Sequence, residues 1–162
     1  MASRRRVSTG WAVAFLGTAG LAVLAASPPL VGGELGAWVH HAFSVACHQI
    51  PERSPHLAGG AVALCHRCSG VVVGLVLGVA AAPLLSARAL GLVGRSRQGR
   101  WLLAAALPAA ADWALGALEL WSNTPASRTA TGLVFGAAAG VVLAANLLRT
   151  PPTQTHPLAH AV

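Results

Sequence analysis

Long apolar runs separated by short polar segments dominate the chain. Four of these runs, at about residues 11–30, 61–85, 101–121 and 131–148, approach or exceed the roughly 20 residues that a helix needs to cross a bilayer. The pattern predicts an all-α, polytopic integral membrane protein with four transmembrane helices, forming one domain over residues 1–148. Residues 149–162 are Pro-rich and polar, which predicts a disordered cytoplasmic tail.

A shorter amphipathic segment, GELGAWVHHAFSVACHQI, precedes the second run. Its apolar residues recur at helical spacing: Leu35, Trp38, Val39, Ala42, Phe43 and Ala46. The other side carries His40, His41, Ser44, Cys47 and His48. We expect a short helix at the outer membrane interface, ending at Pro51.

The first run also has features of a secretory signal peptide, because it follows a basic start and contains small residues at Ala25 and Ala26. Its length and the adjacent Pro28 and Pro29 favour a retained span. Cleavage stays an open alternative.

Composition agrees with a membrane location and sets its orientation. Hydrophobic residues make up 55% of the 162 positions and charged residues 9%, while the net charge is +7. The basic side chains are all arginines at the ends of apolar runs, without a basic, aromatic-rich stripe, which argues against nucleic acid as a partner. One side receives Arg4, Arg5, Arg6, Arg88, Arg95, Arg97, Arg100 and Arg149, so both termini are expected in the cytoplasm, at the cytoplasmic membrane.

Glycines recur every fourth residue in the second and fourth runs. The two stripes are Gly70, Gly74, Gly78 and Gly132, Gly136, Gly140. Small residues at this spacing let helix backbones approach closely, so the stripes predict packing seams and also offer a surface for a homo-oligomer.

The chain gathers all three of its cysteines at the expected outer end of the second span. Cys65 and Cys68 lie one helical turn apart, and Cys47 and His48 can fold back from the preceding segment. One interpretation is a zinc site made by Cys47, Cys65, Cys68 and His48, either structural or related to transport. A second is a thiol–disulfide redox centre, and a third is a structural disulfide in a non-enzymatic scaffold.

Charged residues near or inside the apolar runs supply further candidates. Asp112 falls near the middle of the third run, four residues after Pro108, and needs a partner or a proton. Glu119 lies on the same helix face, within reach of Arg67 or Arg128. These groups predict either a polar path from the cysteine cluster or an ion pair that fixes helix register, while Gln49 and Arg53 are expected to brace the cluster.

These residues resemble a known family. Cys47-His48-Gln49, Pro51, Arg53-Ser54, Cys65, Arg67-Cys68, Gly70 and Gly74 are similar to the signature of the membrane family catalogued as domain of unknown function 2085. Asp112, Arg128, Thr131, Gly132 and Gly136 are similar to the second half of that family. The resemblance implies a small polytopic fold with an outer Cys/His cluster, and it implies no particular activity.

Enzymatic activity stays undecided at this level. Disulfide bond formation protein B and the vitamin K epoxide reductases resemble this chain in architecture, with a CxxC at the outer end of a span and electron transfer to a quinone. The segment SNTPASR between the third and fourth runs has no cysteine, so their second cysteine pair is missing. The sequence also shows no phosphate loop, no dinucleotide fingerprint and no nucleophile with an accompanying base.

Overall fold

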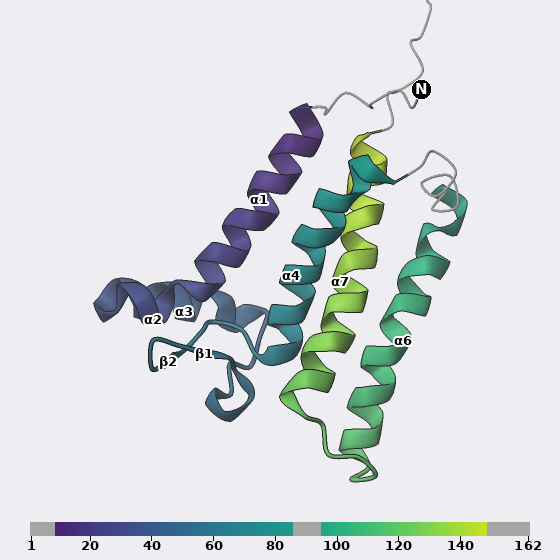
Figure 1. The fold of residues 1–162 in the computed structure, drawn as a ribbon. Helices are drawn as coiled ribbons and strands as arrows, with labels where there is room; N and C mark the ends of the chain where they lie inside the picture. The colour runs from purple at the N-terminus through teal and green to yellow at the C-terminus, as the bar shows by residue number, and fades with distance from the viewer. Residues whose placement is uncertain (1–8, 86–94, 149–162) are drawn as a thin grey trace, which may run out of the picture.

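Four long helices lie side by side in the computed structural model, which describes residues 9–85 and 95–148. They are α1 (Thr9–Ala26), α4 (His66–Ala81), α6 (Gln98–Ala117) and α7 (Pro125–Leu147). Figure 1 shows them in the spatial order α1, α4, α7, α6, with α4 and α7 running in the same direction. The prediction of an all-helical bundle is confirmed, apart from one very short hairpin.

Three of the four helices are long and apolar enough to cross a membrane: Thr9–Ala26, Pro125–Leu147, and His66–Leu84, which combines α4 with the 3-10 turn η3 (Ala82–Leu84). The fourth, α6, is 20 residues long but contains Pro108 and the buried Asp112, which reduce its apolar character. Its side chains Leu103 and Leu107 are well exposed, as a lipid-facing surface would be.

The helix boundaries differ from the apolar runs where local chemistry starts or stops a helix. α4 begins at His66, whereas the apolar run suggested residue 61. α7 begins at Pro125, earlier than the expected residue 131, because Thr124 caps it and Pro125 occupies its first turn. The side-chain oxygen of Thr124 accepts a hydrogen bond from the backbone N–H of Ser127 at 3.1 Å. Arg128 therefore lies in a helix and not in a loop.

The glycine stripes of α4 and α7 face each other, which confirms the predicted packing seam. A Cβ added at Gly74 would lie 2.3 Å from the carbonyl oxygen of Leu133, and one added at Gly136 would lie 2.0 Å from that of Val71. Backbone meets backbone at these positions, so no side chain can move aside. Because both stripes are used within one chain, they supply no free surface for the expected homo-oligomer.

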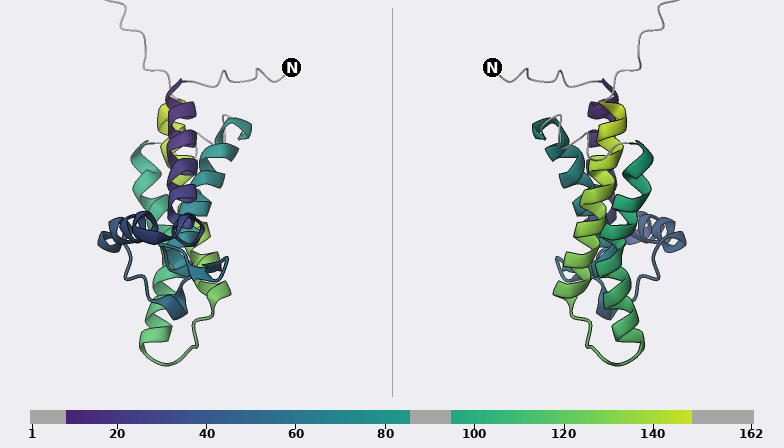
Figure 2. Two further views of the ribbon diagram at one scale, coloured as in Figure 1. Left: turned by 90° about the vertical axis from the view of Figure 1, so that its left-hand side faces the viewer. Right: turned by 90° about the vertical axis from the view of Figure 1, so that its right-hand side faces the viewer.

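The end of the bundle that holds the cysteines is built by the segment between α1 and α4. α2 (Pro28–Val31) and α3 (Gly33–Ala42) run across the direction of α1 (Figures 1 and 2). Gly32 and Gly33 make the turn between them at φ values of 59° and 56°, which glycine adopts without strain. The predicted short helix is thus present, with Leu35 and Trp38 exposed on it.

This short helix ends earlier than expected. We expected it to continue to Pro51, but α3 stops at Ala42 and is followed by the 3-10 turn η1 (Phe43–Val45). Cys47 and His48 therefore lie in a loop. The chain reverses at Gln49, whose φ of 51° is incompatible with a continuing right-handed helix.

The loop then passes through the 3-10 turn η2 (Pro51–Arg53) and a hairpin before α4. The strands β1 (His56–Leu57) and β2 (Gly60–Ala61) pair in antiparallel register. Ala58 and Gly59 make the two-residue turn, both at positive φ, as a type I′ hairpin requires. The backbone N–H of Ala63 donates to the carbonyl of Ala25 at 2.9 Å, which ties this loop to the end of α1.

The opposite end of the bundle has its own anchor. Pro83 has no N–H to donate to the carbonyl of Val79, and the indole N–H of Trp11 donates to that carbonyl at 2.8 Å. Trp11 also stacks on Phe15, with ring centroids 5.5 Å apart. The 3-10 turn η4 (Arg95–Arg97) leads into α6 at this end. Arg4, Arg5, Arg6, Arg88, Arg149 and the expected tail at 149–162 lie outside the described residues.

Candidate metal centre

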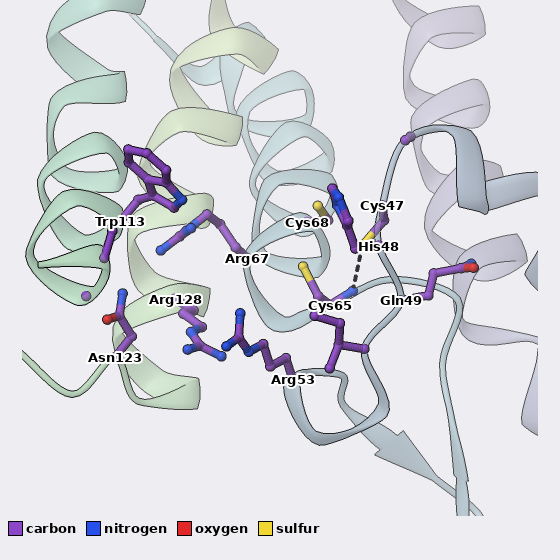
Figure 3. A pocket seen from close by; sticks show the side chains of 14 residues that line it. Cys47, His48, Gln49, Arg53, Cys65, Arg67, Cys68, Trp113, Asn123 and Arg128 are labelled. Carbon is purple, nitrogen blue, oxygen red and sulfur yellow. Dashed lines mark hydrogen bonds between the residues drawn. The ribbon is translucent and has the colours of Figure 1, made fainter. Parts of the chain in front are cut away.

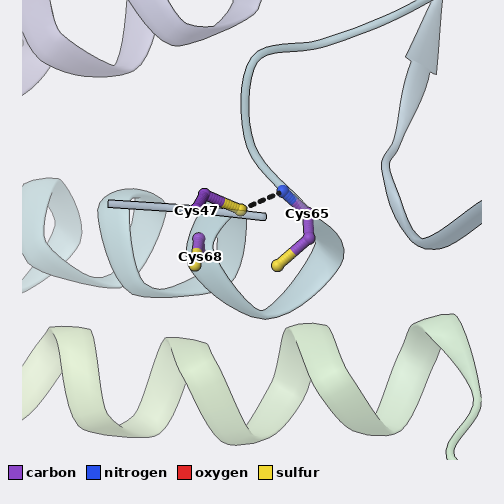
Figure 4. Close-up of side chains that lie close together, drawn as sticks. All are labelled: Cys47, Cys65 and Cys68. Carbon is purple, nitrogen blue, oxygen red and sulfur yellow. Dashed lines mark hydrogen bonds between the residues drawn. The ribbon is translucent and has the colours of Figure 1, made fainter. Parts of the chain in front are cut away.

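Three cysteine sulfurs gather where the loop meets the start of α4 (Figure 4). The Sγ atoms of Cys47, Cys65 and Cys68 all lie within 4.8 Å of one another, and all three cysteines are free. Cys47 is 5% exposed and packs with Ala25 and Leu64 in a small apolar core. The three residue positions proposed from sequence for the sulfur ligands therefore come together.

The start of α4 explains the placement of two of these sulfurs. Cys65 is the N-cap residue and has extended backbone, so its side chain turns back over the first turn, where Cys68 follows. The backbone N–H of Cys65 donates to the Sγ of Cys47 at 3.2 Å, an interaction that stabilises negative charge on sulfur.

The pKa of the Cys65 thiol, which lies just before the candidate span, is lowered. The largest cause is the hydrogen bond from the Cys68 side chain, and backbone N–H groups of the first turn add to it while burial opposes it. One thiolate in this cluster therefore has local hydrogen-bond donors that favour its charged form.

Gln49 fixes the two loops that carry Cys47 and Cys65. Its side-chain nitrogen donates to the carbonyl of His40 at 2.5 Å and to the carbonyl of Ala63 at 2.9 Å. These bonds join the end of α3 to the segment just before Cys65, and they hold the positive φ of Gln49 itself. The expected bracing role of Gln49 thus has a specific geometry.

His48 lies beside the sulfurs and is exposed. The compact ligand group contains the three sulfurs without a histidine nitrogen, in the part of the chain that the structure describes. His66, between Cys65 and Cys68, is likewise outside that group. His48 nevertheless lines the same cavity as the three cysteines.

The cluster opens onto a cavity of about 480 Å³ (Figure 3). The cysteines and His48 form one wall. The other walls carry three arginines from three different elements: Arg53 of η2, Arg67 of α4 and Arg128 of α7. Trp113, Asn123 and apolar residues complete the lining, which contains no carboxylate side chain from the described residues.

The charge of Asp112, which does not line this cavity, is balanced by an arginine that does. Arg67 forms an ion pair with its carboxylate, which links α4 to α6. The Asn123 side-chain nitrogen donates to the Asp112 carboxylate at 2.9 Å and to its backbone carbonyl at 2.6 Å. Of the two roles expected for Asp112, the ion pair between helices is therefore observed.

The remaining charged candidates are placed differently. Arg67–Asp112 is the ion pair found within residues 9–85 and 95–148, so neither Arg53 nor Arg128 has a carboxylate partner there. Glu119 follows α6 as an exposed residue at a φ of 58° and forms no ion pair with Arg67 or Arg128.

Two lining residues were missed from the sequence as parts of the site. Asn123 lies in the SNTPASR segment, where nothing in the pattern distinguishes it from an ordinary loop residue. Gly116 admits it, because a Cβ there would lie 1.8 Å from the Asn123 side-chain oxygen. Trp113 follows Asp112 directly, so its place near the carboxylate was available from the sequence, but its contact with the cavity was not.

Comparison with known proteins identifies a membrane-protein family. The family described as "Predicted membrane protein (DUF2085)" matches residues 47–142, from Cys47 through most of α7. An "Uncharacterized protein MJ1492" from Methanocaldococcus jannaschii is 30% identical over 95 residues, which cover 58% of this chain and 58% of that protein. The chain thus matches less than two thirds of that relative's length, and no solved structure matches it. Since the family match covers more than half of the sequence and includes every cysteine, this chain belongs to the predicted membrane protein family DUF2085.

Proposed function

We propose that this membrane protein binds one zinc ion through Cys47, Cys65 and Cys68, with His48 as the fourth ligand. The observation that carries the proposal is the mutual approach of three free sulfurs within 4.8 Å. Around tetrahedral zinc, with Zn–S bonds of about 2.3 Å, sulfurs lie roughly 3.8 Å apart. Small side-chain rotations therefore suffice to bring the three sulfurs to these separations.

Charge supports a cation at this position. Deprotonated thiols this close together repel one another, and burial of Cys47 strengthens that repulsion. A divalent metal ion removes most of the repulsion, which hydrogen bonds alone do not. Thiolate and imidazole ligands in a tetrahedral set favour zinc among the common biological metals.

The cavity beside the cluster favours an accessible ion over a sealed structural one. His48 is exposed and lines the cavity, so a fourth ligand can leave and return without disturbing the core. A metal held by three fixed sulfurs and one mobile ligand suits exchange, as a role in metal transport needs.

We further propose that the cluster faces out of the cytoplasm, in a cytoplasmic membrane crossed by all four long helices. Arg97 precedes α6 and Arg100 lies in its first turn, at the end of the bundle opposite the cysteines (Figure 1). The positive-inside rule assigns that end, and with it both termini, to the cytoplasm. The exposed Leu35 and Trp38 of α3 support its position at the outer interface, because apolar and indole groups favour that depth.

A membrane thiol–disulfide oxidoreductase is the second candidate function. It is supported by the free Cys65 and Cys68, one turn apart at a helix N-terminus, with Cys47 in contact. In this reaction the two thiols form a disulfide and release two electrons and two protons, which reduce a quinone to a quinol.

The metal content of the detergent-purified protein tests the first proposal. We expect about one zinc ion per chain by elemental mass spectrometry and three titratable thiols after denaturation with a chelator. Serine at any of the three cysteine positions, or His48→Gln, should lower the zinc content, whereas His41→Gln on the exposed face of α3 should not. Absence of metal together with a single titratable thiol would refute the zinc site.

The same preparation separates the two other functions. If the centre is redox-active, replacing Cys65 or Cys68 should abolish disulfide exchange with an external dithiol, while His48→Gln should leave that exchange intact. If the cysteines only stiffen a scaffold, one disulfide should persist and no exchange should be measurable.

A further inference from the structure

We propose that the cavity beside the cysteine cluster binds an oxyanion, of the phosphate or carboxylate type, between Arg53, Arg67 and Arg128. This inference goes beyond the metal site and does not require a metal. It rests on three guanidinium groups that reach one cavity from separate elements of the chain (Figure 3).

The charges around the cavity leave an excess of cations. Asp112 compensates Arg67, but Arg53 and Arg128 have no carboxylate partner within the described ranges. Among those same residues, no aspartate or glutamate lines the cavity. A cysteine cluster that holds one divalent ion through three thiolates carries a single negative charge, so at least one guanidinium charge stays uncompensated. An anion of one or two charges balances it.

One donor of a residue that lines the cavity is also unsatisfied. The Nε–H of Arg67 is buried and has no hydrogen-bond acceptor in the described part of the chain. Buried donors without acceptors are costly, and guanidinium donors in particular match the two oxygens of a carboxylate or phosphate. Arg67 thus has its position fixed by Asp112, while its buried Nε–H still lacks an acceptor.

The N-terminal ends of α4 and α7 also favour an anion in this cavity. Arg67 is the second residue of α4 and Arg128 lies in the first turn of α7, and neither helix has an acidic residue in its first turn. A cation near a helix N-terminus is electrostatically unfavourable, because that end is already positive. An anion bound in front of both helix ends would offset the repulsion between each arginine and the positive end of its helix.

The size and walls of the cavity indicate a small molecule or a headgroup. A volume of about 480 Å³ exceeds that of a single ion and falls in the range of sites for small organic ligands. Trp113 and Ile50 add apolar surface beside the arginines. The oxyanion is therefore carried either by a soluble metabolite or by the headgroup of an anionic lipid, since the cavity is lined by residues at the start of α4 and α7 and at the end of α6.

Binding of radiolabelled inorganic phosphate to the purified protein tests the proposal, at constant ionic strength set with sodium chloride. We expect saturable binding at one site, weakened roughly tenfold or more by Arg53→Gln and by Arg128→Gln, because each removes a charged hydrogen-bond donor. Arg100→Gln is the matched control, since Arg100 lies in the first turn of α6 at the opposite end of the bundle. It should bind phosphate like the wild type, and circular dichroism checks that each variant is folded.

A second arm identifies the source of the oxyanion. The protein is reconstituted into vesicles of phosphatidylcholine with or without phosphatidylglycerol, and retained lipid is detected by native mass spectrometry. Retention of phosphatidylglycerol that is lost in the Arg53 and Arg128 variants and displaced by phosphate supports a lipid headgroup. Phosphate binding that is equal in both vesicles supports a soluble ligand.

Three results would overturn the proposal. The first is the absence of saturable binding of both phosphate and phosphatidylglycerol. The second is equal binding by the Arg53, Arg128 and Arg100 variants. The third is binding that disappears with chelation of metal and is insensitive to the arginines, since the anion would then be only a metal ligand. Because chelated protein is measured in parallel, failure of the zinc proposal leaves this test valid.

Discussion

Replacement of Gly74 by alanine tests the close packing of α4 against α7 that positions the cysteine cluster. The added Cβ would lie 2.3 Å from the carbonyl oxygen of Leu133 and 2.8 Å from the backbone nitrogen of Ala137. Ordinary contacts of carbon with such atoms are about 3.5 Å, so the helices must separate by roughly 1 Å. Both opposing atoms belong to the backbone of α7, which cannot rotate away as a side chain could.

The expected cost follows from two opposing terms. Overpacking against rigid neighbours costs up to about 3 kcal/mol. Alanine gains about 1 kcal/mol over glycine in helix propensity, so the net destabilisation should be about 2 kcal/mol. A Cβ added at Gly20 of α1 would meet no atom within 4 Å. Gly20→Ala therefore has only the gain in helix propensity and should stabilise the protein by about 1 kcal/mol. The two variants should differ by about 3 kcal/mol.

Unfolding in mixed micelles of dodecylmaltoside and sodium dodecyl sulfate, followed by tryptophan fluorescence, measures both free energies. Gly136→Ala should reproduce the effect of Gly74→Ala, because its Cβ would meet the Val71 carbonyl from the other helix. If Gly74→Ala and Gly20→Ala change the unfolding free energy by the same amount, the close backbone packing of α4 against α7 at Gly74 is refuted.

Three further predictions concern buried polar contacts. Asp112→Asn should lower the unfolding free energy, measured by chemical unfolding, by about 3 kcal/mol. This value is the low end for a broken buried ion pair, because Arg67 is partly exposed. Gln49→Leu should weaken zinc binding by roughly tenfold or more in a competition titration with a chromogenic chelator, because the loops that carry Cys47 and Cys65 lose their brace. Trp11→Phe should cost about 1 kcal/mol by leaving the Val79 carbonyl without its donor, as thermal unfolding would show.

Each of these three has a result that would contradict it. Equal loss of stability in Asn123→Ala and Asp112→Asn would place the effect in the Asn123 hydrogen bonds and not in the ion pair. Unchanged zinc affinity in Gln49→Leu would remove the bracing role. Trp38 is 70% exposed, so Trp38→Phe is the control for Trp11, and equal effects of the two would exclude the Val79 bond.

Local sequence patterns accounted for much of the helical framework. Apolar runs marked α1, α4, α6 and α7, since period and composition act within one segment. They set the ends less well, because α7 begins at the cap formed by Thr124 and Pro125, and α3 ends at Ala42, well before Pro51. Hydrophobicity marks neither boundary.

The sequence by itself determined that Cys65 and Cys68 lie one turn apart at the start of a helix and that the glycines at four-residue spacing form seams. Helical geometry fixes both relations without reference to the rest of the chain. Only the tertiary structure decided that the two stripes face each other, that Arg67 takes Asp112 as its partner in place of Glu119, and that Arg53 and Arg128 reach one cavity. These pairings join residues from separate segments, so they depend on how whole helices pack, and no local pattern in the sequence encodes that choice.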